Sequence, residues 1–185
     1  MEPVTVPETS PRTTATRPTT PTRPHQRRLA ALWSAAVGAL ALHNTEEWLL
    51  DMTGWIADHP WLPGRSLHGD QAQYAVALII ITVAALVTAV VAVTARADWS
   101  AEVLVCVAYA LMINAASHLV VSVASWSLMP GAISGTLVLL PLGLAIVRAL
   151  PPVPWTVSAV VTTAIAALAI VVGSLALAAA LVAIT

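Results

Sequence analysis

The chain has 185 residues, of which 58% are hydrophobic and 9% are charged, and its mean hydropathy is +0.85. Because an ordinary soluble domain has roughly 25% charged residues, this composition excludes a soluble globular protein and indicates an integral membrane protein. The net charge is −1 and all eight positive side chains are arginines, so no basic surface predicts binding to nucleic acid. The single cysteine, Cys106, excludes an internal disulfide and a thiolate metal site.

Residues 1–26 differ from the rest of the chain, since they are rich in Pro, Thr and Arg and contain almost no large apolar side chain. Such a segment cannot bury enough surface to offset its ordering entropy. We therefore expect a disordered tail, followed by a transmembrane helical bundle over residues 27–185. Arg12, Arg17 and Arg23 make the tail basic, which favours a cytoplasmic location.

Five apolar stretches follow the tail and predict an all-α fold, a polytopic membrane bundle of about five transmembrane helices. The last four stretches each reach the roughly 18 to 20 residues needed to cross about 30 Å of hydrocarbon. The first reaches that length only if its helix continues through the polar residues after Leu42. Pro141 predicts a kink in the fourth. The stretches are residues 29–42, extended by Trp48–Leu50, then 72–95, 101–126, 130–150 and 155–184.

The charges of the connections favour one orientation. With the tail inside the cell, the connection over residues 51–71 lies outside, and it contains three aspartates and a single arginine, Arg65. Arg96 and Arg148 then lie inside, in agreement with the positive-inside rule. The sequence thus predicts a multi-pass protein of the cell membrane, with a cytoplasmic N-terminus and an extracytoplasmic C-terminus.

A cleaved signal peptide is the alternative for residues 27–41. Arg27 and Arg28, the apolar run after them and the small residues Ala39 and Ala41 resemble such a peptide and its cleavage site. However, 26 residues are long for the segment before the apolar run, and apolar character resumes at Trp48. We therefore expect a retained first span.

The polar segment HNTEE, which begins at His43, lies near the outer end of the first predicted span. A helix rises about 1.5 Å per residue, so His43 lies about 21 Å above the start of its span and His118 about 22 Å above the start of the third. The two imidazoles are therefore expected at matching depth in the outer leaflet. Asn114 lies one turn from His118, and Glu46 and Glu47 lie one turn from His43.

This arrangement predicts a metal site. His43, Glu46 and Glu47 have the helical spacing i, i+3 and i+4, which brings their Cβ atoms to roughly 5 to 6 Å. One imidazole with a carboxylate is half of a zinc or iron site, and His118 would supply a second nitrogen. We therefore expect His43, Glu47 and His118 as ligands of a divalent metal. Glu46 and Glu47 are candidate catalytic carboxylates, because one not bound to the metal could act as general base in a hydrolysis.

Three motifs follow one another along the chain: His43-Asn44-Thr45-Glu46-Glu47, Asn114 with His118, and Met129-Pro130-Gly131. In this order they resemble the HXXEE family of bacterial integral membrane proteins, whose biochemical function is not established. The resemblance covers about residues 29–150 and implies an enzymatic role. Leu128 stands where the family has the tyrosine of a Tyr-x-Pro-Gly element. The residues that the resemblance singles out are His43, Glu46, Glu47, His118, Pro130 and Gly131, and Asn114 joins Pro130 and Gly131 as a supporting residue.

Two classes of function remain open. The first is a metal-dependent hydrolase that acts on a lipid-like substrate. The second is a proton or cation relay in a small transporter, or a pH-responsive polar core in a scaffold without catalytic activity, because histidine changes its charge near neutral pH. A simpler structural interpretation is that Glu46 and Glu47 only end the first helix in the headgroup layer, with Trp48 and Trp55 as interfacial anchors. The lipid bilayer is the expected partner, and the substrate stays undefined.

Overall fold

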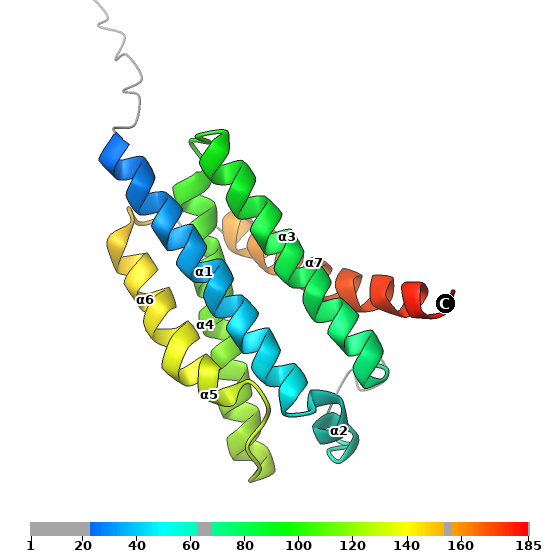
Figure 1. The fold of residues 1–185 in the computed structure, drawn as a ribbon. Coiled ribbons are helices and arrows are strands. Elements are labelled where there is room, and N and C mark those ends of the chain that lie inside the picture. Colours follow the sequence, from blue (N-terminus) through cyan, green and yellow to red (C-terminus); the bar gives the residue numbers. More distant parts are fainter. Residues whose placement is uncertain (1–22, 63–67, 154–156, 185) are drawn as a thin grey trace, which may run out of the picture.

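The computed structural model describes residues 23–62, 68–153 and 157–184, and these ranges contain helices and no strand. Residues 1–22 of the expected tail lie outside them. Helix α1 already begins at Arg23, so the last four residues of that expected tail are helical. Pro24 is compatible with this start, because the first turn of a helix needs no hydrogen bond from its N–H groups. Figure 1 shows the elements α1 (Arg23–Leu49), α2 (Met52–Ala57), α3 (Gln71–Thr94), α4 (Ser100–Ser125), α5 (Ala132–Ser134), the π-helical η2 (Gly135–Leu139), α6 (Leu140–Ala149) and α7 (Val157–Val182).

The expected all-α membrane bundle is confirmed. Among the described residues, four helices are long and apolar enough to cross a membrane: α3, α4, the continuous segment Ala132–Ala149, and Thr163–Val182 of α7. Helix α1 has 27 residues and runs without a break through the HNTEE segment. Because of its polar residues, α1 is not one of these four apolar helices. It nevertheless continues past Leu42 and is therefore as long as the expected first span requires.

The bundle is built around α1, which lies between α3 and α6 with α4 behind it (Figure 1). One core joins these four helices, and many of its buried residues are alanines, such as Ala36, Ala92 and Ala108. Small side chains let membrane helices approach closely, which suits a setting where lipid offers no hydrophobic drive for helix association. Helix α7 packs against α3 outside this group and crosses behind it.

The connection between the first two long helices contains a short helix of its own, α2. Met52 and Ile56 of α2 pack against Tyr74 and Leu78 of α3. The indole N–H of Trp55 also donates to the Ser127 hydroxyl beyond the end of α4, at 3.0 Å. Helix α2 thus joins the ends of α3 and α4.

The fourth span changes its helical geometry where the sequence predicts a disturbance. The N–H of Leu140 bonds to the carbonyl of Gly135, five residues back, which closes a π-helical turn. Pro141 follows directly, and in an ordinary helix its ring would clash with the carbonyl of Leu137 while its missing N–H would leave that carbonyl unpaired. A wider turn accommodates such a break, so the span continues to Ala149.

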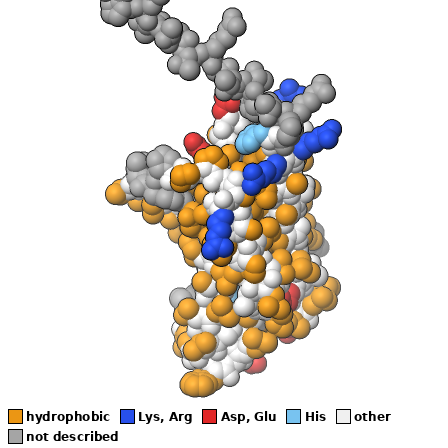
Figure 2. Space-filling model, turned by 90° about the vertical axis from the view of Figure 1, so that its left-hand side faces the viewer, with side chains coloured by type: hydrophobic (Ala, Val, Ile, Leu, Met, Phe, Trp, Pro, Cys, Tyr) orange, Lys and Arg blue, Asp and Glu red, His pale blue; other side chains and the backbone are white. Residues whose placement is uncertain are grey.

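Arginine side chains gather at one end of the bundle (Figure 2). The described ones lie on the first turns of α1, after α3 and on the last turn of α6; they are Arg27, Arg28, Arg96 and Arg148. This segregation is the pattern that the positive-inside rule describes. The orientation of the chain in the membrane stays a prediction.

A buried hydrogen bond in the core generates a first prediction. The indole N–H of Trp33 donates to the Ser100 hydroxyl at 3.0 Å, and both residues are buried. Ser100→Ala leaves this N–H without an acceptor, so we expect the free energy of unfolding in detergent micelles to fall by about 1 to 3 kcal/mol. Ser117→Ala is the control, because Ser117 is exposed and bonds only within its own helix. Equal losses in the two variants would contradict the prediction.

Candidate metal centre

Three side chains from α1 and α4 meet inside the bundle. Nε2 of His43 lies 3.2 Å from Oε1 of Glu47, and Nε2 of His118 lies 3.0 Å from the same oxygen. The two ring centroids are 4.9 Å apart, with an interplanar angle of 77°. His43, Glu47 and His118 are 0%, 6% and 3% exposed. The expectation that the two imidazoles face each other beside an acidic group is confirmed.

The spacing of these three donor atoms fits a metal ion. Within the described residues, His43, Glu47 and His118 form a group whose ligand atoms all lie within 4.8 Å of one another. Bonds of about 2.0 to 2.2 Å in a tetrahedral zinc site place neighbouring ligand atoms roughly 3.3 to 3.6 Å apart. The two nitrogen-to-oxygen contacts of 3.0 and 3.2 Å are close to that spacing.

The hydrogen bond made by Nδ1 of His118 determines whether Nε2 of a neutral ring carries a proton or a lone pair. Nδ1 lies 2.7 Å from the carbonyl oxygen of Pro130. That oxygen only accepts, so Nδ1 carries a proton, and a neutral His118 presents the lone pair of Nε2 to Glu47. An ionised carboxylate is also an acceptor. Two acceptors at 3.0 Å require a proton or a cation between them.

His43 is held in a similar way. Its Nδ1 lies 3.0 Å from the Ser134 hydroxyl, and its Nε2 lies 2.7 Å from Nδ2 of Asn114. With Nδ1 donating to the hydroxyl, the single lone pair of Nε2 accepts from the Asn114 amide, so a metal ion bound at Nε2 would displace that hydrogen bond. Asn114, expected as a supporting residue, therefore contacts the centre directly.

The second oxygen of Glu47 receives a hydrogen bond from a third long helix. The hydroxyl of Tyr74, on α3, donates to Oε2 of Glu47 at 2.8 Å, and both groups are buried. In metal sites, ligating imidazoles almost always donate their other ring N–H to a protein group, and ligating carboxylates are hydrogen-bonded in turn. The partners Ser134, Pro130 and Tyr74 complete this pattern for all three side chains.

The Glu46 side chain binds the start of the fourth span and not the two imidazoles. Its Oε1 accepts from the backbone N–H groups of Gly131 at 3.2 Å and Ile133 at 3.1 Å, and its Oε2 accepts from that of Ser134 at 2.6 Å. The first N–H groups of a helix lack partners within it and attract negative charge. Glu46, expected as a catalytic carboxylate, thus has both oxygens occupied by backbone amides and ties α1 to the start of the fourth span.

Gly131 allows the imidazoles to approach the turn between α4 and α5. Its φ is +89°, a value that favours glycine, and it occupies the N-cap position of α5. A Cβ atom placed on it would lie 2.8 Å from Cε1 of both His43 and His118. Pro130 and Gly131 therefore support the centre through their backbone, by an accepting carbonyl and by the absence of a side chain.

The remaining expectations can be placed around this centre. Glu47 is buried, so the interpretation that the glutamates only end the first helix in the headgroup layer does not describe it. Leu128 is 61% exposed, so a tyrosine at that position would be attached at the surface of the bundle. Asn44 of the motif bonds to Thr82 at 2.8 Å and fastens α1 to α3.

Sequence reasoning missed two members of the site, Tyr74 and Ser134. Tyr74 lies in the first turn of α3, at the same end of the bundle as the motif, and this shared depth is a signal for it. Ser134 follows Gly131 by three residues, and no pattern in the chain distinguishes it from the other serines. Its role depends on how the fourth span is rotated against α1.

Comparisons with known proteins add one finding. A family model described as a protein of unknown function with HXXEE motif matches residues 34–146. The match contains all the residues of the centre described above. Neither the curated proteins nor the solved structures contain a significant match to this chain.

The close approach at Gly131 generates a second prediction. Gly131→Ala places a methyl group against both imidazoles and strains a backbone with positive φ. We expect a loss of about 1 to 3 kcal/mol in the free energy of unfolding, measured by unfolding in detergent micelles. Gly38→Ala is the matched control, because nothing lies within 4 Å of a Cβ placed there. A Gly131→Ala protein as stable as Gly38→Ala would contradict the geometry.

Proposed function

Because the chain belongs to the HXXEE family of proteins of unknown function, its activity must be inferred from the site, and we propose that it is a metal-dependent membrane hydrolase. His43, Glu47 and His118 would hold a divalent ion, zinc or iron. The observation that carries this proposal is the convergence of two Nε2 atoms on one carboxylate oxygen. The other polar atom of each side chain is already bound to a protein group.

The ligand set suits catalysis better than a purely structural site. Structural zinc sites have four protein ligands, whereas catalytic ones commonly have three, such as two histidines and a glutamate, and keep a position open. Two histidines and a carboxylate also form the facial set of iron(II) enzymes. When bound, the ion supplies Lewis-acid chemistry, which polarises a carbonyl or phosphoryl oxygen and activates water.

The surroundings of the centre favour an amphiphilic substrate. Leu42 and Ile113, the neighbours of His43 and Asn114 in the chain, are 53% and 69% exposed, and Ile113 lies on a helix that is apolar enough to cross a membrane. A substrate that approaches this part of the bundle from the side therefore comes from the hydrocarbon layer. A lipid-like ester or phosphoester is the class of substrate that we infer.

The residues of the centre divide into those that act on the substrate and those that hold the others. Glu47 is the carboxylate available as ligand or as proton acceptor. Asn114 lies beside Nε2 of His43 and could donate a hydrogen bond to charge that develops on the substrate. Glu46 and Gly131 are positioning residues, because they act through the turn that presents Pro130 and Ser134 to the imidazoles.

One set of contacts favours a second candidate, a proton or cation relay. Glu47 lies within hydrogen-bond distance of His43, His118 and the Tyr74 hydroxyl. This is a continuous chain of groups that exchange protons, and histidine is suited to that role. In the hydrolase a metal ion lies between the imidazoles and the carboxylate, whereas in the relay a proton does. Metal analysis distinguishes the two candidates.

Metal content is the test of the proposed function. We expect the protein purified without chelator to contain about one equivalent of zinc or iron per chain, measured by elemental mass spectrometry. His43→Ala and His118→Ala should each lose nearly all of it. His59→Ala is the control, because His59 contacts Trp55 and lies outside the three-residue group. A wild-type protein that lacks metal, yet conducts protons in liposomes in a pH-dependent way, would favour the relay instead.

Tyr74→Phe tests whether Glu47 is a ligand. This variant keeps the ring packed against α2 and removes the hydroxyl that donates to Oε2 of Glu47. Loss of such a partner typically lowers metal affinity about 10- to 100-fold, which competition with a chelator of known affinity measures. Tyr109→Phe, at the other tyrosine of the chain, should leave the affinity unchanged. An unaltered affinity in Tyr74→Phe would argue against Glu47 as ligand.

A further inference from the structure

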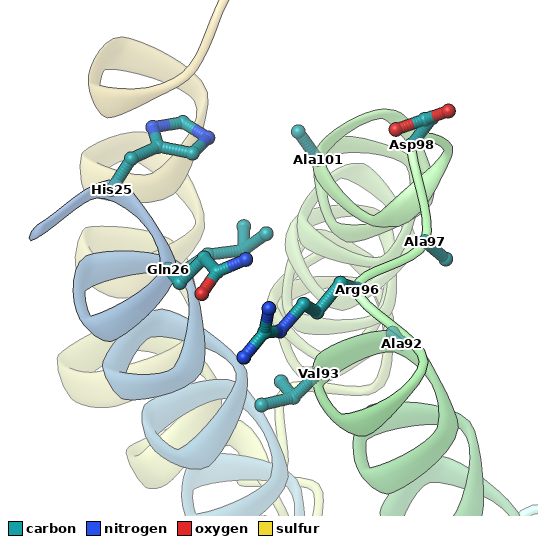
Figure 3. Close-up of a pocket in the computed structure, with 9 residues that line it drawn as sticks. His25, Gln26, Ala92, Val93, Arg96, Ala97, Asp98 and Ala101 are labelled. Atoms are coloured by element: carbon teal, nitrogen blue, oxygen red, sulfur yellow. The ribbon is translucent and has the colours of Figure 1, made fainter. Parts of the chain in front are cut away.

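A second polar site lies at the arginine-rich end of the bundle, between the start of α1 and the turn that joins α3 to α4. It is a cavity of about 110 Å³. Figure 3 shows its lining, in which the Arg96 side chain extends from the turn toward α1 and lies beside Gln26. His25 and Asp98 are at its rim, and small residues such as Ala92 and Ala97 leave space between the helices.

The backbone at Arg96 is unusual for a residue of its size. Arg96 has φ +49°. The N–H of Ala97 bonds to the carbonyl of Ala92, and the N–H of Arg96 bonds to that of Val93, at 3.3 and 3.4 Å. These bonds define the helix-ending motif in which glycine normally occupies the left-handed position. A large side chain kept in a strained conformation is a reason to look for a function of that side chain.

The charged residues that line the cavity are Arg96 and Asp98, and further arginines lie near it. Arg27 and Arg28 on the first turns of α1 are exposed, and arginines gather at this end of the molecule (Figure 2). Asp98 and Glu102 are the nearby acids in the chain. In the part of the chain that the structure describes, no carboxylate lies within ion-pair distance of Arg96. Its guanidinium is therefore available to an anionic ligand.

We propose that this cavity binds the phosphate group of an anionic phospholipid. A guanidinium matches two phosphate oxygens at once, and basic pockets between transmembrane helices are sites for anionic lipid headgroups. His25 and Gln26 can donate further hydrogen bonds to the same group. The proposal does not depend on the metal centre, which lies toward the other end of α1.

The exposed apolar surface on the last turns of α3 favours a lipid over free phosphate. Val87, Val90 and Val91 of α3 are 55%, 50% and 46% exposed, and they precede the turn that carries Arg96. An acyl chain can lie along these valines while its phosphate contacts Arg96. Free phosphate would use only the polar part of this surface.

The test compares lipid binding by Arg96→Asn with binding by the wild type. The full chain is purified in detergent, titrated with phosphatidylglycerol or phosphatidylcholine, and examined by native mass spectrometry. Asparagine adopts positive φ readily, so this variant removes the charge and keeps the turn, which thermal unfolding verifies. We expect affinity for phosphatidylglycerol to fall at least about fivefold, the effect of one arginine near a membrane surface. Phosphatidylcholine carries the same phosphate beside a choline cation that offsets its charge, so its binding should be weaker in the wild type and should fall less in the variant.

Three further measurements make the outcome decisive. Arg148→Gln, at the same end of the bundle but outside the cavity, should retain phosphatidylglycerol, and Arg96→Lys should bind more of it than Arg96→Asn does. Inorganic phosphate should not displace the lipid. Equal binding by the wild type and Arg96→Asn would overturn the proposal, as would an equal loss in Arg148→Gln. Displacement of the lipid by inorganic phosphate at comparable concentration would instead identify a site for free phosphate.

Discussion

The burial of Glu47 between two imidazoles is the constraint on which the rest of this structure depends. A buried charge is costly unless it is paired and hydrogen-bonded, so the bundle must compensate the carboxylate. It does so with the Nε2 atoms of His43 and His118 and with the hydroxyl of Tyr74. Because these groups come from α1, α3 and α4, one buried charge determines how three long helices pack at this depth. The same demand makes a shared proton or a metal ion necessary at the centre.

The HNTEE segment and the Pro130-Gly131 turn act as one unit. Successive residues of a helix point about 100° apart, so Glu46 and Glu47 cannot serve the same site. Glu47 faces the imidazoles, whereas Glu46 binds the amides that open the fourth span. That contact positions the carbonyl of Pro130 against His118. The first glutamate therefore binds the turn whose groups contact the two imidazoles.

The two ends of the bundle are specialised differently. The buried polar centre lies toward the end that α2 closes, and the arginines and the cavity of about 110 Å³ lie at the other. Helix α7 packs on α3, and none of its described side chains belongs to the three-residue group of the centre. The family match over residues 34–146 also ends before α7. The matched range thus contains the residues that build the centre and excludes α7, whose apolar composition suits contact with lipid.

The sequence by itself determined the membrane class, the apolar helices and the matching depth of His43 and His118, because these depend on composition and on the constant rise of a helix. The sequence also named Glu47 as the partner of the two imidazoles. Only the tertiary structure decided that Glu46 binds the backbone amides of the fourth span and that Tyr74 and Ser134 complete the centre. Those contacts depend on how each helix is rotated about its axis. A helix that is apolar on every side carries little periodic signal of its rotation, so packing between helices sets it.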